Sequence, residues 1–189
     1  MSDHSTRCAW AKKPLDILYH DHEWGVPLKN EQQLFEFLIL EGVQAGLSWS
    51  IVLQRREAYR EAYDHFDPKL VATYSQQKID ELLSNPALIR NKLKILASVK
   101  NAQAFLETQQ ACGSFSQYLW AFVDHVPIIN HWQTAEQIPS ETTLSQALSK
   151  DLKKRGFSFV GPTICYALMQ ATGLVNDHLT TCFRHSELS

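Results

Sequence analysis

The chain has 189 residues, of which 44% are hydrophobic and 20% are charged, and its formal net charge is −2. This composition is typical of one soluble globular domain. The near-neutral charge excludes a generally basic nucleic-acid-binding chain, so any contact with nucleic acid must rest on a local basic face. No apolar run approaches the length of a membrane span, and the four cysteines are too scattered for a disulfide framework, so we expect a cytoplasmic protein without a membrane segment.

Most segments carry a helix pattern that begins with a capping residue, which predicts an all-α fold. In chain order, we expect helices over residues 31–42, 49–63, 68 onwards, 75–83, about 88–113, 118–122, 144–154 and 162–173. The expected caps are Asn30, Ser48, Asp67, Ser75, Asn85, Ser114 and Thr143, and a proline follows Asp67 and Asn85 directly. Residues 126–129 contain a proline and are expected to form a connection, and 130–140 a loop.

Two pairs of soft metal ligands stand near opposite ends of the chain: Cys8 with His20, and His178 with Cys182. Two thiolates and two imidazoles are the ligand set of a closed tetrahedral zinc site, and the four-residue spacing of the second pair predicts both ligands on one helical face. If the four meet on one ion, they join the N- and C-terminal segments. No short zinc motif spans them, and His22 is a possible competing ligand.

Residues 144–173 predict two helices around a tight turn bounded by Gly156 and Gly161. Such a turn aims backbone N–H groups and the positive N-terminus of the second helix outward, where a phosphate can bind. Lys153, Lys154 and Arg155 stand directly beside it and form the densest positive cluster of the chain, which makes contact with a DNA backbone plausible. The alternative is an ordinary solvated helix end.

Glu41 ends an apolar helix and stands among glycines and aromatic residues. A glutamate usually faces solvent, because an unpaired buried carboxylate is costly. The neighbouring Trp49, with Tyr19 and Trp24 on either side of His20, favours instead a pocket for a flat, positively charged or amine-bearing ligand. The alternative for the aromatic residues is core filling, which we prefer for three tryptophans: Trp10, Trp120 and Trp132.

Several runs together resemble the 3-methyladenine DNA glycosylase I family of the helix-hairpin-helix superfamily. They are residues 19–27 (YHDHEWGVP), 40–49 (LEGVQAGLSW), 66–68 (FDP), 153–166 (KKRGFSFVGPTICY) and 173–178 (GLVNDH). The matches stay in order from Cys8 to Cys182 and cover essentially the whole chain. The resemblance implies a single glycosylase domain over 1–189, with the helix-hairpin-helix at about 144–173.

The same resemblance implies a DNA repair enzyme that flips 3-methyladenine out of alkylated double-stranded DNA and hydrolyses its N-glycosidic bond. It implies a monomer without an obligate protein partner. By position, the catalytic and base-recognising carboxylate would be Glu41, and the base-binding residues Tyr19, Trp49, Trp24 and Asp16. The DNA-binding residues would be Leu47 as the wedge, with Lys153, Arg155, Phe159 and Gly161, and a structural zinc would bind to Cys8, His20, His178 and Cys182.

Three positions qualify the resemblance. The family often has Tyr where Asp16 stands and Gln where Val43 stands, so an aromatic wall and a polar contact of the pocket differ here. Helix-hairpin-helix glycosylases usually carry a catalytic Asp shortly after the hairpin. Asp177 lies near that place but is not taken as catalytic in this family, and we expect it to hold that region.

Two other functions remain open from the residues alone. A non-enzymatic DNA-binding module would use the hairpin and the zinc site and would not need Glu41. A zinc hydrolase would use the metal for chemistry, although four protein ligands close the coordination shell that a catalytic zinc keeps open.

Overall fold

The structure, a computed structural model, describes residues 6–189, and the first five residues of the predicted 1–189 domain lie outside the described part. Its α-helices are α1 (Pro14–His22), α2 (Glu31–Gln44), α3 (Trp49–Ala62), α4 (Pro68–Val71), α5 (Gln76–Ser84), α6 (Lys92–Cys112), α7 (Phe115–Trp120), α8 (Thr143–Lys154), α9 (Pro162–Ala171) and α10 (Phe183–Glu187). Three 3₁₀ turns, η1 (Asp64–Phe66), η2 (Ala121–Val123) and η3 (Ala135–Gln137), and two short strands complete it. The predicted all-α class is confirmed apart from the strands.

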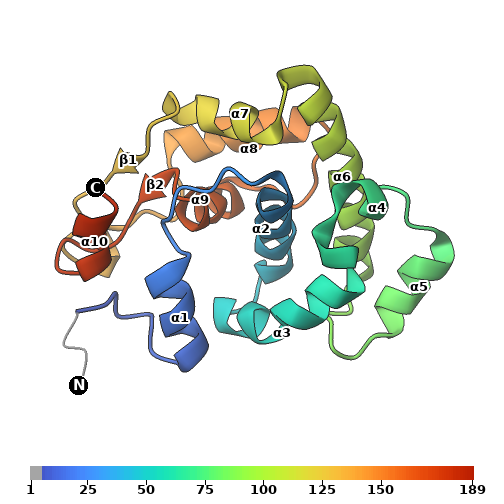
Figure 1. Cartoon of the computed structure of the whole chain (residues 1–189), viewed down its shortest axis with the longest axis horizontal. Helices are drawn as coiled ribbons and strands as arrows, with labels where there is room; N and C mark the ends of the chain where they lie inside the picture. Colours follow the sequence, from blue (N-terminus) through green and yellow to red (C-terminus); the bar gives the residue numbers. More distant parts are fainter. Residues whose placement is uncertain (1–5) are drawn as a thin grey trace.

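Helix α2 lies at the centre of the molecule, with the other long helices arranged around it (Figure 1). Ten consecutive residues of α2, 34–43, are buried, so this helix has no solvent face. It packs against α3, α6, α7 and α9, and the buried side chains of these helices join one continuous hydrophobic cluster. Any polar side chain on α2 is therefore carried into the core.

The ends of several helices differ from the sequence-based expectation. Helix α2 continues past Gly42 to Gln44. A Cβ added at Gly42 would lie 3.4 Å from the Cβ of Phe159, so Gly42 is a point of close contact with the turn that carries Phe159. Asn85 does not begin a helix: its side chain accepts a hydrogen bond from the Ala87 N–H in a turn. The long helix α6 accordingly begins only at Lys92.

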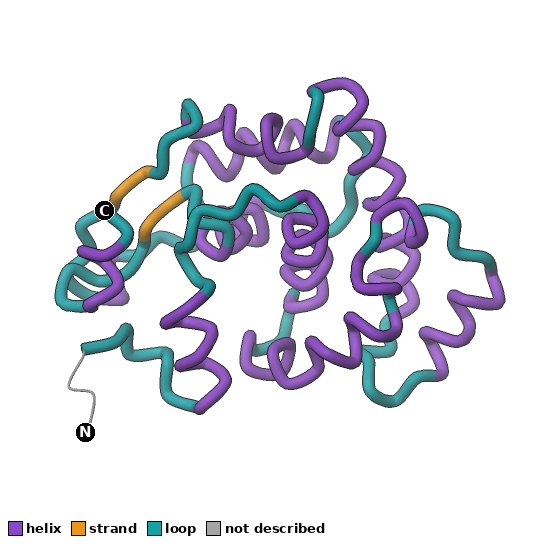
Figure 2. Tube along the Cα trace, in the orientation of Figure 1, coloured by secondary structure: helices purple, strands orange, loops and turns teal. Residues whose placement is uncertain are grey.

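The two strands, β1 (Ile128–Ile129) and β2 (Val175–Asn176), pair in parallel (Figure 2). The prediction that 126–129 form only a connection is therefore wrong for Ile128 and Ile129. Pro127 precedes the first paired residue, so its missing N–H costs the pair no hydrogen bond. No described helix is long and apolar enough to span a membrane.

Gly173 lies where the chain leaving α9 crosses the segment between α1 and α2. Its φ is +71°, and a Cβ there would lie 2.4 Å from the carbonyl carbon of Val26. Gly46 has a similar φ of +83° but no heavy atom within 4 Å of an added Cβ. We expect Gly46→Ala to cost only the roughly 1 kcal/mol of an unfavourable φ, and Gly173→Ala to cost several times more. Urea unfolding of the two variants measures the difference in their free energies of unfolding. Equal losses of stability would contradict the close approach of Gly173 to the Val26 backbone.

Candidate active site and metal centre

A cavity of about 240 Å³ opens at the C-terminal end of α2. Its lining comes from α1 and the segments on either side of it, from α2, the first turn of α3, the end of η3 and α9. It consists of Trp10, Tyr19, Trp24, Glu41, Gln44, Trp49, Ile138, Ala167 and Gln170. The cavity is smaller than the roughly 300–1,000 Å³ of sites for drug-sized ligands. Its size and its aromatic lining suit one flat ring system.

Glu41 is the charged group of this cavity. Its side chain is buried, 4% exposed, because α2 is buried on every side. Desolvation raises its pKa from the ordinary value of 4.5 to about 8. Its Oε2 atom has no hydrogen-bond partner among the described residues. A buried carboxylate that lacks a partner is costly, so the solvent-facing alternative is excluded and a ligand is the natural partner.

Four aromatic residues surround Glu41. The ring centroids of Tyr19 and Trp49 lie 5.3 Å apart with their planes at 45°, and those of Trp10 and Trp24 lie 5.2 Å apart, edge to face. The pKa of Tyr19 lies well above its ordinary value because of desolvation and, second, the charge of Glu41, so its hydroxyl keeps its proton. The Nε1 donor of Trp49 is buried and has no partner among the described residues. The cavity thus combines π faces with unsatisfied polar atoms.

The three tryptophans that the sequence analysis assigned to the core lie in three different environments. Trp120 is a core residue, 1% exposed, whose Nε1 donates to the Leu28 carbonyl. Trp10 is 39% exposed and lines the cavity, so its assignment to the core is wrong. Trp132 is half-buried, and its Nε1 donates to Asp177.

Asp16 does not line the cavity. It is buried in α1, and the hydroxyl of Ser50 donates to both of its carboxylate oxygens, at 2.7 and 2.9 Å. Ser50 directly follows Trp49 in the first turn of α3, so this contact joins α1 to the wall that Trp49 forms. The structure therefore places Asp16 behind the wall of the cavity.

The lining residues that the sequence analysis did not select are Gln44, Ile138, Ala167 and Gln170. Ile138 follows η3 in a segment predicted to be a loop, and no periodic pattern marks it. Lys94 was also missed: its Nζ donates to the carbonyls of Val43 and Ala45, both at 2.7 Å, and so caps the C-terminus of α2 below the cavity.

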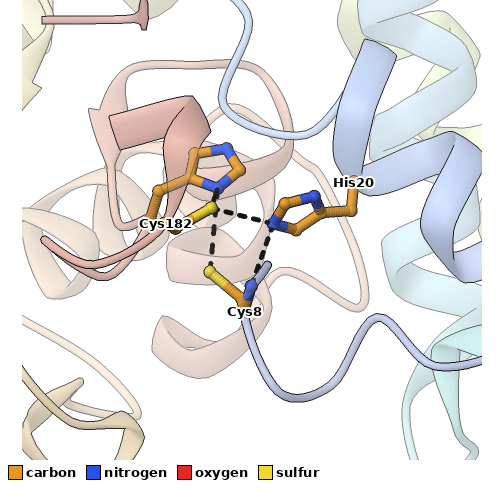
Figure 3. Close-up of side chains that lie close together, drawn as sticks. Cys8, His20 and Cys182 are labelled. Carbon is orange, nitrogen blue, oxygen red and sulfur yellow. Dashed lines mark hydrogen bonds between the residues drawn. The ribbon is translucent and has the colours of Figure 1, made fainter. Parts of the chain in front are cut away.

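The four predicted metal ligands meet in one buried group, with all ligand atoms within 4.8 Å of one another. Sγ of Cys182 lies 3.4 Å from Nε2 of His20 and 3.5 Å from Nδ1 of His178, and Sγ of Cys8 lies 3.7 Å from the same Nδ1 (Figure 3). A tetrahedral metal ion with ligand bonds of about 2.0–2.3 Å separates its ligand atoms by roughly 3.3–3.8 Å. The residues therefore fit a tetrahedral ion.

The ring nitrogens that face away from the group are also engaged. Nδ1 of His20 lies 2.7 Å from Asp21, and Nε2 of His178 lies 3.0 Å from the Trp24 carbonyl. Such outer contacts fix the tautomer and orientation of metal-binding histidines. The pKa of Cys182 is lowered by hydrogen bonds to its sulfur, first from Cys8, which favours the thiolate.

Two details of the metal group differ from the sequence-based expectation. The residues from 177 to 182 form an extended segment and a turn, and α10 begins only at Phe183, so the prediction that His178 and Cys182 share a helical face is wrong. The turn still brings their side chains together. His22 is exposed and lies outside the group.

The turn between α8 and α9 is fixed to α6 and α8 by polar contacts, and one of its side chains packs against α2. Asn101 of α6 accepts from the Ser158 N–H and donates to its carbonyl, and Ser149 donates to the Val160 carbonyl. Between them, Phe159 adopts a positive φ of 55° and packs against Gly42, one residue from Glu41. The turn and the cavity are therefore parts of one rigid arrangement.

The three positively charged residues beside this turn differ in how far their charges are available to a ligand. Arg155 donates to Asp151 at 2.7 Å and lies 4.6 Å above the Tyr118 ring, so its charge is engaged within the protein. Lys153 and Lys154 are exposed and form no ion pair with any described residue. Gly161 precedes α9, which has no side-chain cap, and the space around Gly161 is open.

Leu47 lies in the connection between α2 and α3, next to the exposed Gly46. Its side chain is half-buried, and its N–H donates to the Gln44 carbonyl. Gly46 takes up the positive φ that the reversal between the two helices needs. The structure thus places Leu47 on the same connection that carries Gln44 and Trp49 to the cavity.

A larger cavity of about 650 Å³ lies between α7 and α8, beside Tyr118, Phe122, Asp151 and Arg155. Its charged groups already bind one another, and Tyr118 donates to Asp151 at 2.9 Å. It holds no buried polar atom that lacks a partner among the described residues. We therefore take the smaller cavity with Glu41 as the functional one.

Comparison with known proteins gives consistent matches over nearly the whole chain. The family model of methyladenine glycosylase matches residues 9–185. A DNA-3-methyladenine glycosylase of Haemophilus influenzae is 50% identical over 94% of this chain and 97% of its own length. A crystal structure of a 3-methyladenine DNA glycosylase I, 50% identical, superposes with a TM-score of 0.92 over 94% of this chain and 98% of its own. A variant of such an enzyme in complex with 3-methyladenine, 39% identical, superposes with a TM-score of 0.91 over 94% and 96%.

Proposed function

The chain belongs to the methyladenine glycosylase family, and from this premise we propose that it is a DNA repair enzyme that excises 3-methyladenine from alkylated DNA. The reaction is hydrolysis of the N-glycosidic bond. The observation that carries the proposal is Glu41, a buried carboxylate without a partner in a cavity lined by aromatic residues. A relative in complex with 3-methyladenine supports the choice of base.

The chemistry of the substrate explains the site. Methylation at N3 makes adenine in DNA a cation and a good leaving group, so the enzyme needs extraction and positioning more than strong acid catalysis. The pKa of Glu41 near 8 holds it protonated in the empty site at neutral pH, and a cationic base lowers that pKa and favours the carboxylate. Neutral adenine gives no such gain, which favours the damaged base.

The residues around Glu41 hold the base once it has left the stack. Flipping costs a few kcal/mol, and stacking on aromatic faces returns about 1–3 kcal/mol per base. Tyr19, Trp24 and Trp49 supply these faces, and Trp10 joins them at the edge of the cavity. The ionised Glu41 also stabilises the oxocarbenium-like sugar as the bond breaks, and water then attacks the anomeric carbon.

The metal group has the role of a structural zinc site in this proposal. Cys8, His20, His178 and Cys182 would hold the ion, and two sulfur and two nitrogen ligands in a tetrahedral arrangement are typical of zinc. The four ligands leave no open position for catalysis. Because His20 follows Tyr19 directly and Nε2 of His178 contacts the Trp24 carbonyl, the ion would fix two walls of the base pocket.

DNA would bind across the hairpin between α8 and α9, used as a helix-hairpin-helix element. Gly161 and the uncapped N-terminus of α9 would bind a phosphate, with Lys153 beside them. Phe159 and Arg155 shape the hairpin from inside, and Leu47 would fill the gap that the flipped base leaves. In this proposal the substrate is alkylated double-stranded DNA. The protein would act in the cytoplasm as one domain over 1–189, a monomer that makes these contacts without a protein partner.

The exposed lysines of the hairpin give a direct test of this surface. We expect Lys153→Ala and Lys154→Ala to weaken binding to any duplex sequence and each to lower the slope of log K against log salt by about 0.9. The control is Lys69→Ala, an exposed lysine on α4. Fluorescence anisotropy at several salt concentrations measures the slopes. If Lys69→Ala changes the slope as much as the hairpin variants do, the assignment of the surface is wrong.

The proposed function itself is tested by incubating the protein with methylated duplex DNA and separating the released bases by chromatography. Release of 3-methyladenine is the expected result. Binding to duplex DNA without release of any base would favour the DNA-binding module instead. Release that depends on the metal while folding stays intact would favour the zinc hydrolase.

A further inference from the structure

Asp177 is a buried carboxylate, 1% exposed, that collects four hydrogen-bond donors. Asn130 Nδ2 and Trp132 Nε1 donate to its Oδ1 at 2.7 and 2.8 Å. The Tyr166 hydroxyl and Gln170 Nε2 donate to its Oδ2 at 2.6 and 2.8 Å. Burial, the hydrogen bond to Asp177 and its charge raise the pKa of Tyr166 well above the usual range, so that hydroxyl keeps its proton and donates.

The carboxylate of Asp177 fixes the orientation of the Gln170 side-chain amide. A carboxylate that already receives three other donors can only accept, so the NH₂ group of Gln170 must face Asp177. The carbonyl oxygen of that amide is then directed away from Asp177. It accepts no hydrogen bond from any described residue, and Gln170 lines the same cavity as Glu41. An acceptor of fixed orientation is therefore available in the wall of the cavity that α9 forms.

We propose that Gln170 is a specificity-determining residue of the base pocket, and that Asp177 is a positioning residue that fixes the Gln170 carbonyl oxygen as an acceptor for the exocyclic amine of the flipped base. This inference rests on the proposed function and adds the group that recognises the amine. An exocyclic amine carries two N–H donors. Glu41 accepts one of them and Gln170 the other.

The same arrangement selects against purines with a carbonyl in place of the amine. A 6-keto purine such as 3-methylguanine would bring an acceptor toward the acceptor of Gln170, and neither atom would be satisfied. A freely turning glutamine could rotate its NH₂ group toward such a base, whereas the one held by Asp177 cannot. Sites that hydrogen-bond one substrate group discriminate strongly against analogues that lack it.

The test measures binding of the free bases by the fluorescence of the pocket tryptophans, separately from excision. The protein and its Gln170→Met variant are titrated with 3-methyladenine and with 3-methylguanine. Methionine keeps the length of the side chain and removes its polar atoms. We expect the affinity ratio between the two bases to fall about tenfold in Gln170→Met, mainly through weaker binding of 3-methyladenine.

The matched control is Trp132→Phe, which removes one donor from the other oxygen of Asp177 without touching the cavity. It should keep the affinity ratio of the unchanged protein. An unchanged ratio in Gln170→Met, or an equal fall in Trp132→Phe, would overturn the inference. These equilibrium titrations are independent of the excision assay. A protein that releases no 3-methyladenine would contradict the proposed function. A change in the affinity ratio between 3-methyladenine and 3-methylguanine, compared between Gln170→Met and the unchanged protein, decides the role of Gln170.

The role of Asp177 is tested by combining variants. Asp177→Asn frees the Gln170 amide to turn and should lower the same ratio. If Asp177 acts through Gln170, the double variant Gln170→Met, Asp177→Asn is no less selective than Gln170→Met alone. Additive losses would overturn the positioning role. Should Asp177→Asn fail to fold, the inference is decided by Gln170→Met alone, and an unchanged affinity ratio in that variant overturns it.

Discussion

Replacement of Glu41 by glutamine should lower the release of 3-methyladenine from alkylated DNA by roughly 10- to 100-fold while duplex binding is retained. Glutamine keeps the shape of the side chain but removes the negative charge, and a hydrogen bond to a charged group contributes about 1.5–3 kcal/mol. Single-turnover release measured by chromatography gives the rate, and anisotropy with an uncleavable duplex gives the affinity.

Glu36→Gln is the matched control, because Glu36 is also a buried glutamate of α2. Its Oε1 binds Arg56 and Arg60, away from the cavity, so its replacement should cost stability and leave the rate of base release near that of the unchanged protein. If Glu41→Gln keeps the full rate of release, Glu41 is not the group that recognises the base.

The raised pKa of Glu41 also predicts how stability depends on pH. The native state holds this proton up to about pH 8, whereas the unfolded chain loses it near 4.5, so the contribution of Glu41 to stability is full below 4.5 and is lost as the pH rises to 8. The loss is about 1.4 kcal/mol per pH unit within that window. The Glu41→Gln variant has no ionisable group at this position and does not lose this stability. At pH 9 its free energy of unfolding should therefore exceed that of the unchanged protein, and urea unfolding of both proteins at pH 6.5 and 9 measures the difference.

Loss of the metal should have the largest effect on stability. Cys182→Ser leaves three ligands around the proposed zinc and is expected to lower the free energy of unfolding by several kcal/mol, because structural zinc binding contributes directly to folding. The walls formed by Tyr19 and Trp24 should loosen as well, so binding of 3-methyladenine falls with stability. Metal content by mass spectrometry and thermal unfolding with and without a chelator measure both effects.

Cys165→Ser provides the comparison for this variant. Cys165 is equally buried, at 1% exposed, but its sulfur donates to the Val160 carbonyl and lies outside the metal group. It should lose little stability and keep its metal and its response to the chelator. Equal behaviour of the two variants would mean that the four ligands do not hold an ion.

Much of the fold could be predicted because local signals and burial agree. Asn30, Asp67, Ser75 and Ser114 cap helices as their side chains indicated. The burial of Glu41 was harder to foresee, since a glutamate at the end of a helix usually faces solvent. Only the packing of other helices on every side of α2 decides it, and that packing is a property of the whole chain.

The missing parts of the site come from long-range contacts that leave no local pattern. Trp10 lies outside any helix, and its ring contacts with Tyr19, His20 and Trp24 hold it at the cavity. Ile138 and Gln170 lie 32 positions apart, and both line the cavity only because α9 returns to it. The hydroxyl of Ser50 turns Asp16 from a candidate base contact into a link between helices.

The position of the ligands in the chain has a mechanical consequence. Cys8 and His178 lie 170 residues apart, yet their ligand atoms are in contact. Chain ends ordinarily fray first, and partial unfolding spreads inward from them. With an ion bound, the segment from Cys8 to Cys182 is closed into a ring, so unfolding of this segment has to begin at an internal position. Limited proteolysis should therefore cut the metal-free chain first near Cys8 and Cys182, and the metal-loaded chain first in a loop between them.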